Sequence, residues 1–289
     1  MNNLDLKFGR RRLKYLFPLV ALSLLFSPAV PPAWAGGLVK AVSQNPEAQK
    51  LIDQAWALQK SDYTTDIFKQ CIAWMEEADR LDAGNPSVLT DLSRYYWQYG
   101  DSLPKQTPEQ QKKLEELFSR GRDLAEKSLK IRETPDGHYW YAVNRAASLE
   151  FRSFFSQVAA FPSLYSQTRY VLEHDPDYDY GAPGRLWAEI LARVPRKLVM
   201  TVGEKYVEDA VREIDKSISR EPRFLDNYNY KARFMNAFFE NREEALRLLD
   251  TELKMDPGAL PDEITPNRFA QRSARRLWKT ITGREYPEK

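Results

Sequence analysis

Amphipathic segments that end on a proline recur through most of this chain, and they constrain its fold more than any other feature. Five such segments, ADRLDAGNP, KSLKIRETP, RYVLEHDP, KSISREP and TELKMDP, end on Pro86, Pro135, Pro176, Pro222 and Pro257. Proline lacks a backbone N–H and disfavours helix in the residue before it, so it suits the start of a helix and marks a break between two. From Pro46 onward apolar residues follow spacings of three and four, without clean period-two runs. The pattern predicts an all-α fold.

The spacing of these prolines indicates a repeat. Successive intervals are 49, 41, 46 and 35 residues, and the last is close to the period of about 34 residues of the tetratricopeptide (TPR) repeat. Small or apolar residues step by four before the last two prolines, at Ala210, Ile214 and Ile218 and at Ala245, Leu249 and Leu253. Ala232 stands ten residues after Pro222, where the two helices of a TPR come closest. We predict a superhelical array of TPR-like antiparallel helix pairs, as a single domain over residues 36–289.

Residues 1–35 have the features of a cleaved signal peptide. Five cations between Lys7 and Lys14 precede the apolar run Tyr15–Phe26, and Ala33-Trp34-Ala35 forms a cleavage pattern. Prolines cut the run short of the roughly 20 apolar residues that a membrane anchor needs. We therefore expect an exported, periplasmic protein, while the choice between Sec and twin-arginine export stays open.

The residue after the leader bears on membrane attachment. A lipoprotein would carry a cysteine directly after its signal sequence, but Gly36 stands there, so we expect a soluble mature protein that begins at Gly36. Cys71 is the only cysteine, which excludes an intramolecular disulfide or a thiolate zinc site, and its helical pattern indicates a small core residue.

The charge balance gives no reason to expect nucleic acid as a partner. The chain has 43 Lys+Arg and 41 Asp+Glu, of which the leader holds five and one. The mature protein therefore carries a formal charge of −2, and the basic excess belongs to the leader.

Two aromatic clusters stand at matching places in consecutive repeats. LSRYYWQYGD covers residues 92–101, and GHYWYAVNRA covers residues 137–146. The first helices of TPR pairs line the concave surface, which is the usual binding face. Trp97 and Trp140 are therefore candidates both for helix packing and for the wall of a groove, and the sequence leaves the two interpretations open.

Helix geometry separates neighbouring rings in the second cluster. Trp140 and Tyr141 point about 100° apart, so they cannot share one core face. We predict that Trp140 packs between helices, while Tyr141, with Asn144 or Arg145, faces a concave cavity. The apolar stripe on the Trp140 side comprises Val143, Ala147 and Phe151.

Three stretches resemble the T-component family of the tripartite ATP-independent periplasmic (TRAP) transporters. They are YWYAVNRAA, DPDYDYGAPGRLWAEILARVP from Asp175 to Pro195, and YVEDAVREIDKSISREPRFLDNYNYKARF followed by REEALRLLDTEL. The middle stretch is the most specific, because its Pro-Asp-Tyr turn and its Gly-Ala-Pro-Gly helix entry, with Arg185 and Trp187, are similar to the family's long insert between repeats. The resemblance spans about residues 50–289. It implies a TPR-like protein that pairs with a periplasmic solute-binding protein and encloses a hydrophobic channel. Known members are often lipoproteins, a feature from which this chain departs.

Catalytic motifs are absent from the sequence. It contains no H-E-x-x-H, G-x-S-x-G, G-x-G-x-x-G or P-loop, and His138 and His174 stand 36 residues apart. We interpret His174 as a helix C-terminal cation favoured by the helix dipole. The sequence predicts a protein that is not an enzyme and needs neither a metal nor a cofactor.

Two functions remain as hypotheses. The first is a periplasmic component associated with a TRAP-type transporter, which binds a solute-binding partner protein and a hydrophobic ligand. The second is a periplasmic TPR scaffold for protein–protein interaction with no small ligand. A closed apolar cavity favours the first, and an open, charged groove favours the second. Ligand, partner and homo-oligomeric state stay open. The candidate binding residues are Trp97, Trp140, Tyr141, Asn144, Arg145, Tyr178, Tyr180, Arg185 and Trp187.

Overall fold

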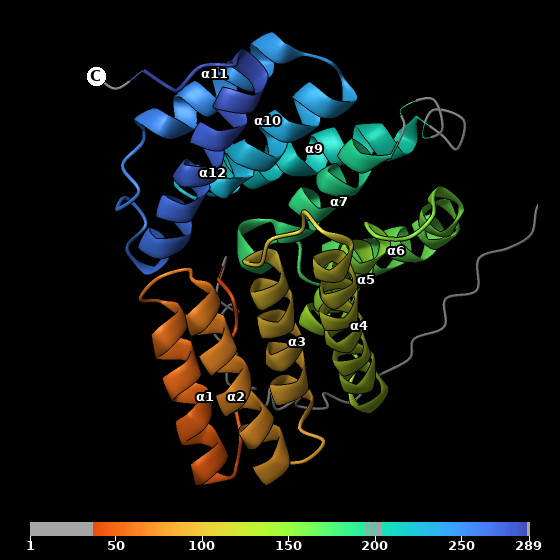
Figure 1. Ribbon diagram of the computed structural model, residues 1–289, viewed down its shortest axis with the longest axis vertical. Coiled ribbons are helices and arrows are strands. Elements are labelled where there is room, and N and C mark those ends of the chain that lie inside the picture. The colour runs from red at the N-terminus through yellow and green to blue at the C-terminus, as the bar shows by residue number, and fades with distance from the viewer. Residues whose placement is uncertain (1–36, 195, 197–198, 200–203, 288–289) are drawn as a thin grey trace, which may run out of the picture. The chain divides into compact units, whose positions relative to one another are not determined.

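The computed structural model describes residues 37–194, 196, 199 and 204–287, and all regular elements of this part of the chain are helices (Figure 1). The proposed signal peptide, its cleavage site at Gly36 and Pro195 lie outside the described residues. The all-α prediction is confirmed. The helices are α1 (Pro46–Gln59), α2 (Thr65–Leu81), α3 (Pro86–Asp101), α4 (Pro108–Ile131), α5 (Pro135–Leu149), α6 (Phe154–His174), η1 (Tyr178–Tyr180), α7 (Ala182–Arg193), α9 (Lys205–Arg220), α10 (Asp226–Phe238), α11 (Arg242–Lys254), η2 (Pro261–Glu263) and α12 (Ile264–Thr282).

Local capping explains where the early helices begin. Four of them start on a proline, at Pro46, Pro86, Pro108 and Pro135. The residue before each proline accepts hydrogen bonds from backbone N–H groups of the first turn, through the side chains of Asn45, Asn85, Thr107 and Thr134. Of the five prolines that end the recurring segments, the last three lie instead in the connections that follow α6, α9 and α11, namely Pro176, Pro222 and Pro257. All five repeat prolines therefore mark helix breaks, but only Pro86 and Pro135 begin the next helix.

Packing follows the order of the chain. From α1 to α7 each helix packs against the next, and α7 also contacts α9 and α10, while α10 contacts α11 and α12. One buried cluster, with Phe68, Cys71 and Tyr95, joins α1 to α3, and a second, with Trp187 and Phe234, extends over the later helices. Cys71 is fully buried, which agrees with its predicted core role. Among the helices described, none is long and apolar enough to cross a membrane.

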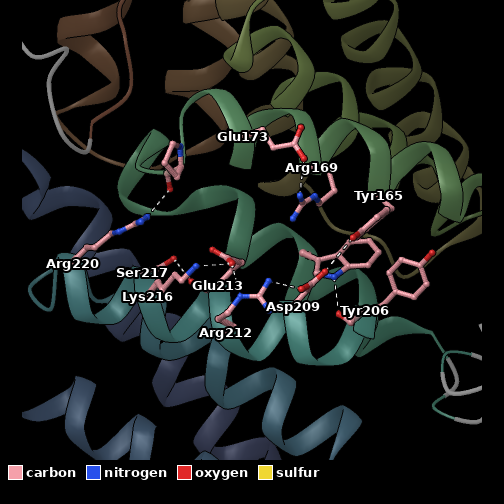
Figure 2. A network of polar contacts seen from close by, with 12 residues as sticks. Tyr165, Arg169, Glu173, Tyr206, Asp209, Arg212, Glu213, Lys216, Ser217 and Arg220 are labelled. Carbon is pink, nitrogen blue, oxygen red and sulfur yellow. Dashed lines mark hydrogen bonds and ion pairs between the residues drawn. The ribbon is translucent and has the colours of Figure 1, made fainter. Parts of the chain in front are cut away.

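Polar contacts fix α9 against α6 and α7 (Figure 2). Tyr165 of α6 donates a hydrogen bond from Oη to Oδ2 of Asp209 on α9, at 3.1 Å. One turn further along α9, Glu213 accepts from Arg212 and Lys216, each at 3.0 Å. Two further hydrogen bonds join α9 to α7 and its start: Trp187 Nε1 donates to the carbonyl oxygen of Tyr206 at 2.9 Å, and Ser217 Oγ donates to that of Gly181 at 3.2 Å.

Ala232 gives a direct test of the helix register. It is fully buried in α10, which packs against α7, α11 and α12. Ala232→Leu should overpack this contact and lower the free energy of unfolding by about 1–3 kcal/mol. Ala237→Leu, at an exposed position of the same helix, is the matched control. Urea denaturation of both variants measures the difference, and equal stability of the two would show that the contact at Ala232 has room for a larger side chain.

Candidate functional site

A cavity of about 780 Å³ lies between α3, α5, α7, α10 and α12. Its volume falls within the range of about 300–1,000 Å³ that is typical of small-molecule sites. Aromatic side chains from α3, α4, α5, α10 and α12 and from connections between helices contribute to its lining: Tyr63, Trp97, Phe118, Tyr139, Trp140, Phe151, Phe224, Tyr230 and Phe269. Size and lining make this cavity the candidate binding site.

The last helix, α12, contacts the connection between α1 and α2 at one side of the cavity. The rings of Tyr63 and Phe269 lie 4.7 Å apart between centroids, and both line the cavity. Next to them Thr265 Oγ1 donates a hydrogen bond to the carbonyl oxygen of Lys60, at 2.7 Å. This pairing joins residues 205 positions apart, so α12 lies beside the connection between α1 and α2. Figure 1 shows α12 next to this connection, and the cavity is bounded there by a contact between distant parts of the chain.

Helices α3 and α5 supply an aromatic wall. Trp140 is 5% exposed, and its Nε1 donates a hydrogen bond to Tyr178 Oη at 2.9 Å. Its ring lies 5.8 Å from that of Trp97, and both rings line the cavity. Tyr178 is buried behind Trp140 and supports the wall without being part of the lining.

Trp140 is buried, as predicted, but the side of α5 that faces the cavity is also the Trp140 side and not the predicted Tyr141 side. The apolar stripe of Val143, Ala147 and Phe151 lines the cavity together with Trp140. Tyr141 and Arg145 lie outside this lining and contact each other, with Arg145 Nη1 donating to Tyr141 Oη at 2.6 Å. The reason is that α5 packs against α3, α4 and α6, so the stripe side is the one left facing the open space.

Asn144 is a packing residue in this structure. It is fully buried, and its Nδ2 donates to Ser93 Oγ at 3.1 Å and to the carbonyl oxygen of Trp140 at 3.0 Å. A Cβ atom at Gly121 of α4 would lie only 2.3 Å from its Oδ1, so Gly121 permits this close helix contact. The expectation that Asn144 helps to face the cavity is therefore not met.

Two further aromatic candidates lie away from the cavity lining. Trp187 is buried between α6, α7 and α9, where its Nε1 donates to the carbonyl oxygen of Tyr206 at 2.9 Å. Tyr180 stacks on Phe224 at 4.7 Å between centroids. Of the nine predicted site residues, the structure brings three into the lining, namely Trp97, Trp140 and Arg185.

Arg185 organises the turn that leads into α7. It is 4% exposed, and its guanidinium donates to Asp179 Oδ2 at 2.6 Å and to Asn227 Oδ1 at 2.8 Å. It also donates to the carbonyl oxygens of Asp179 and Tyr180, two residues with positive φ. Burial raises the pKa of Asp179 to about 6, even though the Arg185 charge opposes that shift. The Arg185 charge is therefore neutralised within the turn.

Charged side chains that the sequence analysis did not single out line the same cavity. Glu189 pairs with Arg193 at 2.6 Å and Arg233 at 3.1 Å, and Glu150 pairs with Lys105 and Arg193. On α7 the spacing Arg185, Glu189, Arg193 places three charges on one helix face. This i, i+4, i+8 stripe is the pattern that could have identified them.

Three other carboxylates of the lining have no ion pair within the described residues: Asp101, Asp226 and Glu263. Burial raises the pKa of Asp226, which lies half-buried at the start of α10. Burial, together with the nearby Asp179 charge, raises the pKa of Glu263 to about 7. The cavity therefore contains carboxylates whose ionised form is poorly stabilised by the protein alone.

Glu263 predicts a pH dependence of stability. Its folded pKa of about 7 exceeds the ordinary value of 4.5, so the folded state binds more protons across that window. The free energy of unfolding should consequently fall as pH rises from about 4.5 to 7. Glu263→Gln should make this decline shallower, while the exposed Glu126→Gln should not change it. Thermal melts between pH 4.5 and 8 test this, and a Glu263→Gln slope equal to that of wild type would contradict it.

Comparison with known proteins adds no assignment: no protein-family model matches the chain, and no curated protein is significantly similar to it. Among the described residues, no group of three or more His, Cys, Asp or Glu side chains is placed to hold a metal ion. What the protein binds is therefore inferred from the cavity and its lining.

Proposed function

We propose that the protein is a non-enzymatic, periplasmic TPR-like component of a TRAP-type transporter, which binds a solute-binding partner and holds a small ligand in its cavity. The observation that carries the proposal is the cavity of about 780 Å³ with its aromatic wall. The resemblance of residues 175–195 to the family's insert supports the link to transport. Within this stretch, η1 and α7 contribute Asp179, Arg185, Glu189 and Arg193 to the cavity lining.

The lining favours a ligand with two kinds of surface. Trp97, Trp140 and Val143 present apolar surface from α3 and α5, while α7 and α10 present charged groups such as Glu189 and Arg233. A purely hydrophobic ligand would remove water from these charged groups without replacing its hydrogen bonds, which costs free energy. We therefore propose a ligand with an apolar body and a polar group.

The test combines ligand retention with partner capture. The mature protein, purified from the periplasm, should carry a small ligand detectable by native mass spectrometry. It should also retain the TRAP solute-binding protein encoded in the same genome. Ala147→Trp adds bulk at a lining position and should abolish ligand retention, whereas the exposed Ala73→Trp should not. Absence of both ligand and partner from the wild-type protein would overturn the proposal.

A specific surface feature favours the scaffold as a second candidate function. Phe154 and Phe155 begin α6 with 46% and 82% of their surface exposed. Exposed aromatic side chains are enriched at protein–protein interfaces. If Phe155→Ala abolishes partner capture and Ala147→Trp leaves it intact, with no ligand found, the scaffold function holds in place of ligand binding.

A further inference from the structure

The charged side chains of the cavity lining balance one another. The lining contains equal numbers of cations and carboxylates, and four of its cations are each paired with a carboxylate of the same lining: Lys105, Arg185, Arg193 and Arg233. Cations and carboxylates both remain outside these pairs, so neither sign predominates. A charged ligand would lose its hydration without meeting an excess of the opposite charge, which costs free energy. The balance favours an uncharged ligand.

Tyr139 of α5 presents a polar group that the protein itself leaves without a partner. Its side chain is 9% exposed, and its ring packs edge-on against Trp140, with centroids 5.0 Å apart, and against Tyr178 at 5.1 Å. The hydroxyl forms no hydrogen bond within the described residues. It is not one of the unpartnered atoms that are sealed in the core, so it is open to the cavity that Tyr139 lines. A nearly buried hydroxyl of this kind gains from any group that can form a hydrogen bond with it.

The free polar groups beside Trp140 are hydrogen-bond donors. Burial raises the pKa of Tyr139, so its hydroxyl stays protonated at neutral pH and can donate. The ring of Trp97 lies 5.8 Å from that of Trp140 and lines the cavity, and its Nε1 has no hydrogen-bond partner in the described part of the chain. An indole N–H can only donate. These donors favour a ligand that brings an acceptor.

We propose that Tyr139 is the polar anchor of the cavity, and that its hydroxyl donates a hydrogen bond to a carbonyl oxygen of an uncharged ligand whose apolar body lies against the Trp140 ring. The few polar groups of a mostly apolar pocket fix the orientation of its ligand in this way. The inference rests on the ligand-binding role proposed above and specifies the ligand's polar group. A volume of about 780 Å³ leaves room for a body of one or two aromatic rings.

Four probes with the same naphthalene ring test this anchor by equilibrium dialysis against the mature protein at pH 7.5. They are 2-acetylnaphthalene, which carries a carbonyl oxygen, 2-ethylnaphthalene, which lacks an acceptor, anionic 2-naphthoate and cationic 2-naphthylmethylammonium. 2-Acetylnaphthalene should bind about fivefold or more tightly than 2-ethylnaphthalene, the ratio expected of one net hydrogen bond. Both charged probes should bind less tightly than 2-acetylnaphthalene.

Tyr139→Phe removes only the hydroxyl. It should reduce the advantage of 2-acetylnaphthalene to about twofold or less and leave the binding of 2-ethylnaphthalene unchanged. The melting temperature should also stay unchanged, because the hydroxyl has no partner within the described residues. Tyr99→Phe removes a tyrosine hydroxyl of α3 outside the cavity lining, and this matched control should keep the full advantage. If Tyr139→Phe unfolds or melts well below wild type, the hydroxyl serves the fold and the inference is overturned.

The remaining outcomes separate this inference from the proposed function. If 2-acetylnaphthalene and 2-ethylnaphthalene bind equally, and Ala147→Trp abolishes their binding, the cavity binds ligands but the anchor role of Tyr139 is overturned. A charged probe that binds most tightly would overturn the uncharged class. If no probe binds, the inference is also overturned, while a small ligand retained in native mass spectrometry and capture of the solute-binding partner would still support the proposed function.

Discussion

Trp140→Ala should lower the free energy of unfolding by about 3–5 kcal/mol, which makes it one of the two most damaging substitutions that we expect. Truncating a buried aromatic ring removes its transfer free energy and leaves a void. Trp140 is 5% exposed and packs edge-on against Tyr139, with centroids 5.0 Å apart. Its indole also donates the hydrogen bond that satisfies Tyr178 Oη in the core. Urea denaturation followed by circular dichroism measures the loss.

Tyr141→Ala is the matched control for this prediction. Tyr141 is the next residue of α5 but is only half-buried, and its hydroxyl hydrogen bond is to Arg145 on the same helix. Losing this hydrogen bond should lower the free energy of unfolding by about 1 kcal/mol, the typical net contribution of one hydrogen bond. Equal losses at the two positions would mean that Trp140 contributes no more to packing than its half-buried neighbour.

Much of the fold could be predicted from local chemistry. Pro86 and Pro135, each preceded by a capping side chain, begin helices because cap and proline act within one turn. Ala232 is buried as expected, because small residues at regular helical spacings report the packed face. Both signals depend only on residues close in the sequence.

The candidate site was harder to predict because it depends on contacts distant in sequence. Helix geometry separates Trp140 from Tyr141, but which side meets a cavity depends on where α3, α4 and α6 pack. The pairing of Tyr63 with Phe269 joins the beginning and the end of the array, and no repeat pattern encodes it. Charged residues such as Asp226 look like part of a solvated helix face until the fold encloses them.

The second large effect is expected at Arg185, whose substitution should lower the free energy of unfolding by an amount that depends on pH. Arg185→Met removes the cation that neutralises Asp179 and leaves that carboxylate buried without its partner, at a cost of about 3–5 kcal/mol. Asp179 already has a raised pKa of about 6 because of burial, and losing Arg185 should raise it further. At pH 5 the carboxyl would then be protonated in the folded variant, so the loss should be smaller at pH 5 than at pH 8.

The double variant Arg185→Met/Asp179→Asn separates charge from hydrogen bonding. Removing the Asp179 carboxylate should recover part of the stability at pH 8, because no unpaired charge then remains in the turn. The part that is not recovered measures the hydrogen bonds that Arg185 donates to Asn227 and to the carbonyl oxygens of the turn. Urea denaturation of wild type and of the single and double variants at both pH values measures the charge contribution and the hydrogen-bond contribution of Arg185 to the free energy of unfolding. Equal losses for Arg185→Met at pH 5 and pH 8 would show that those hydrogen bonds, rather than the charge, account for the role of Arg185.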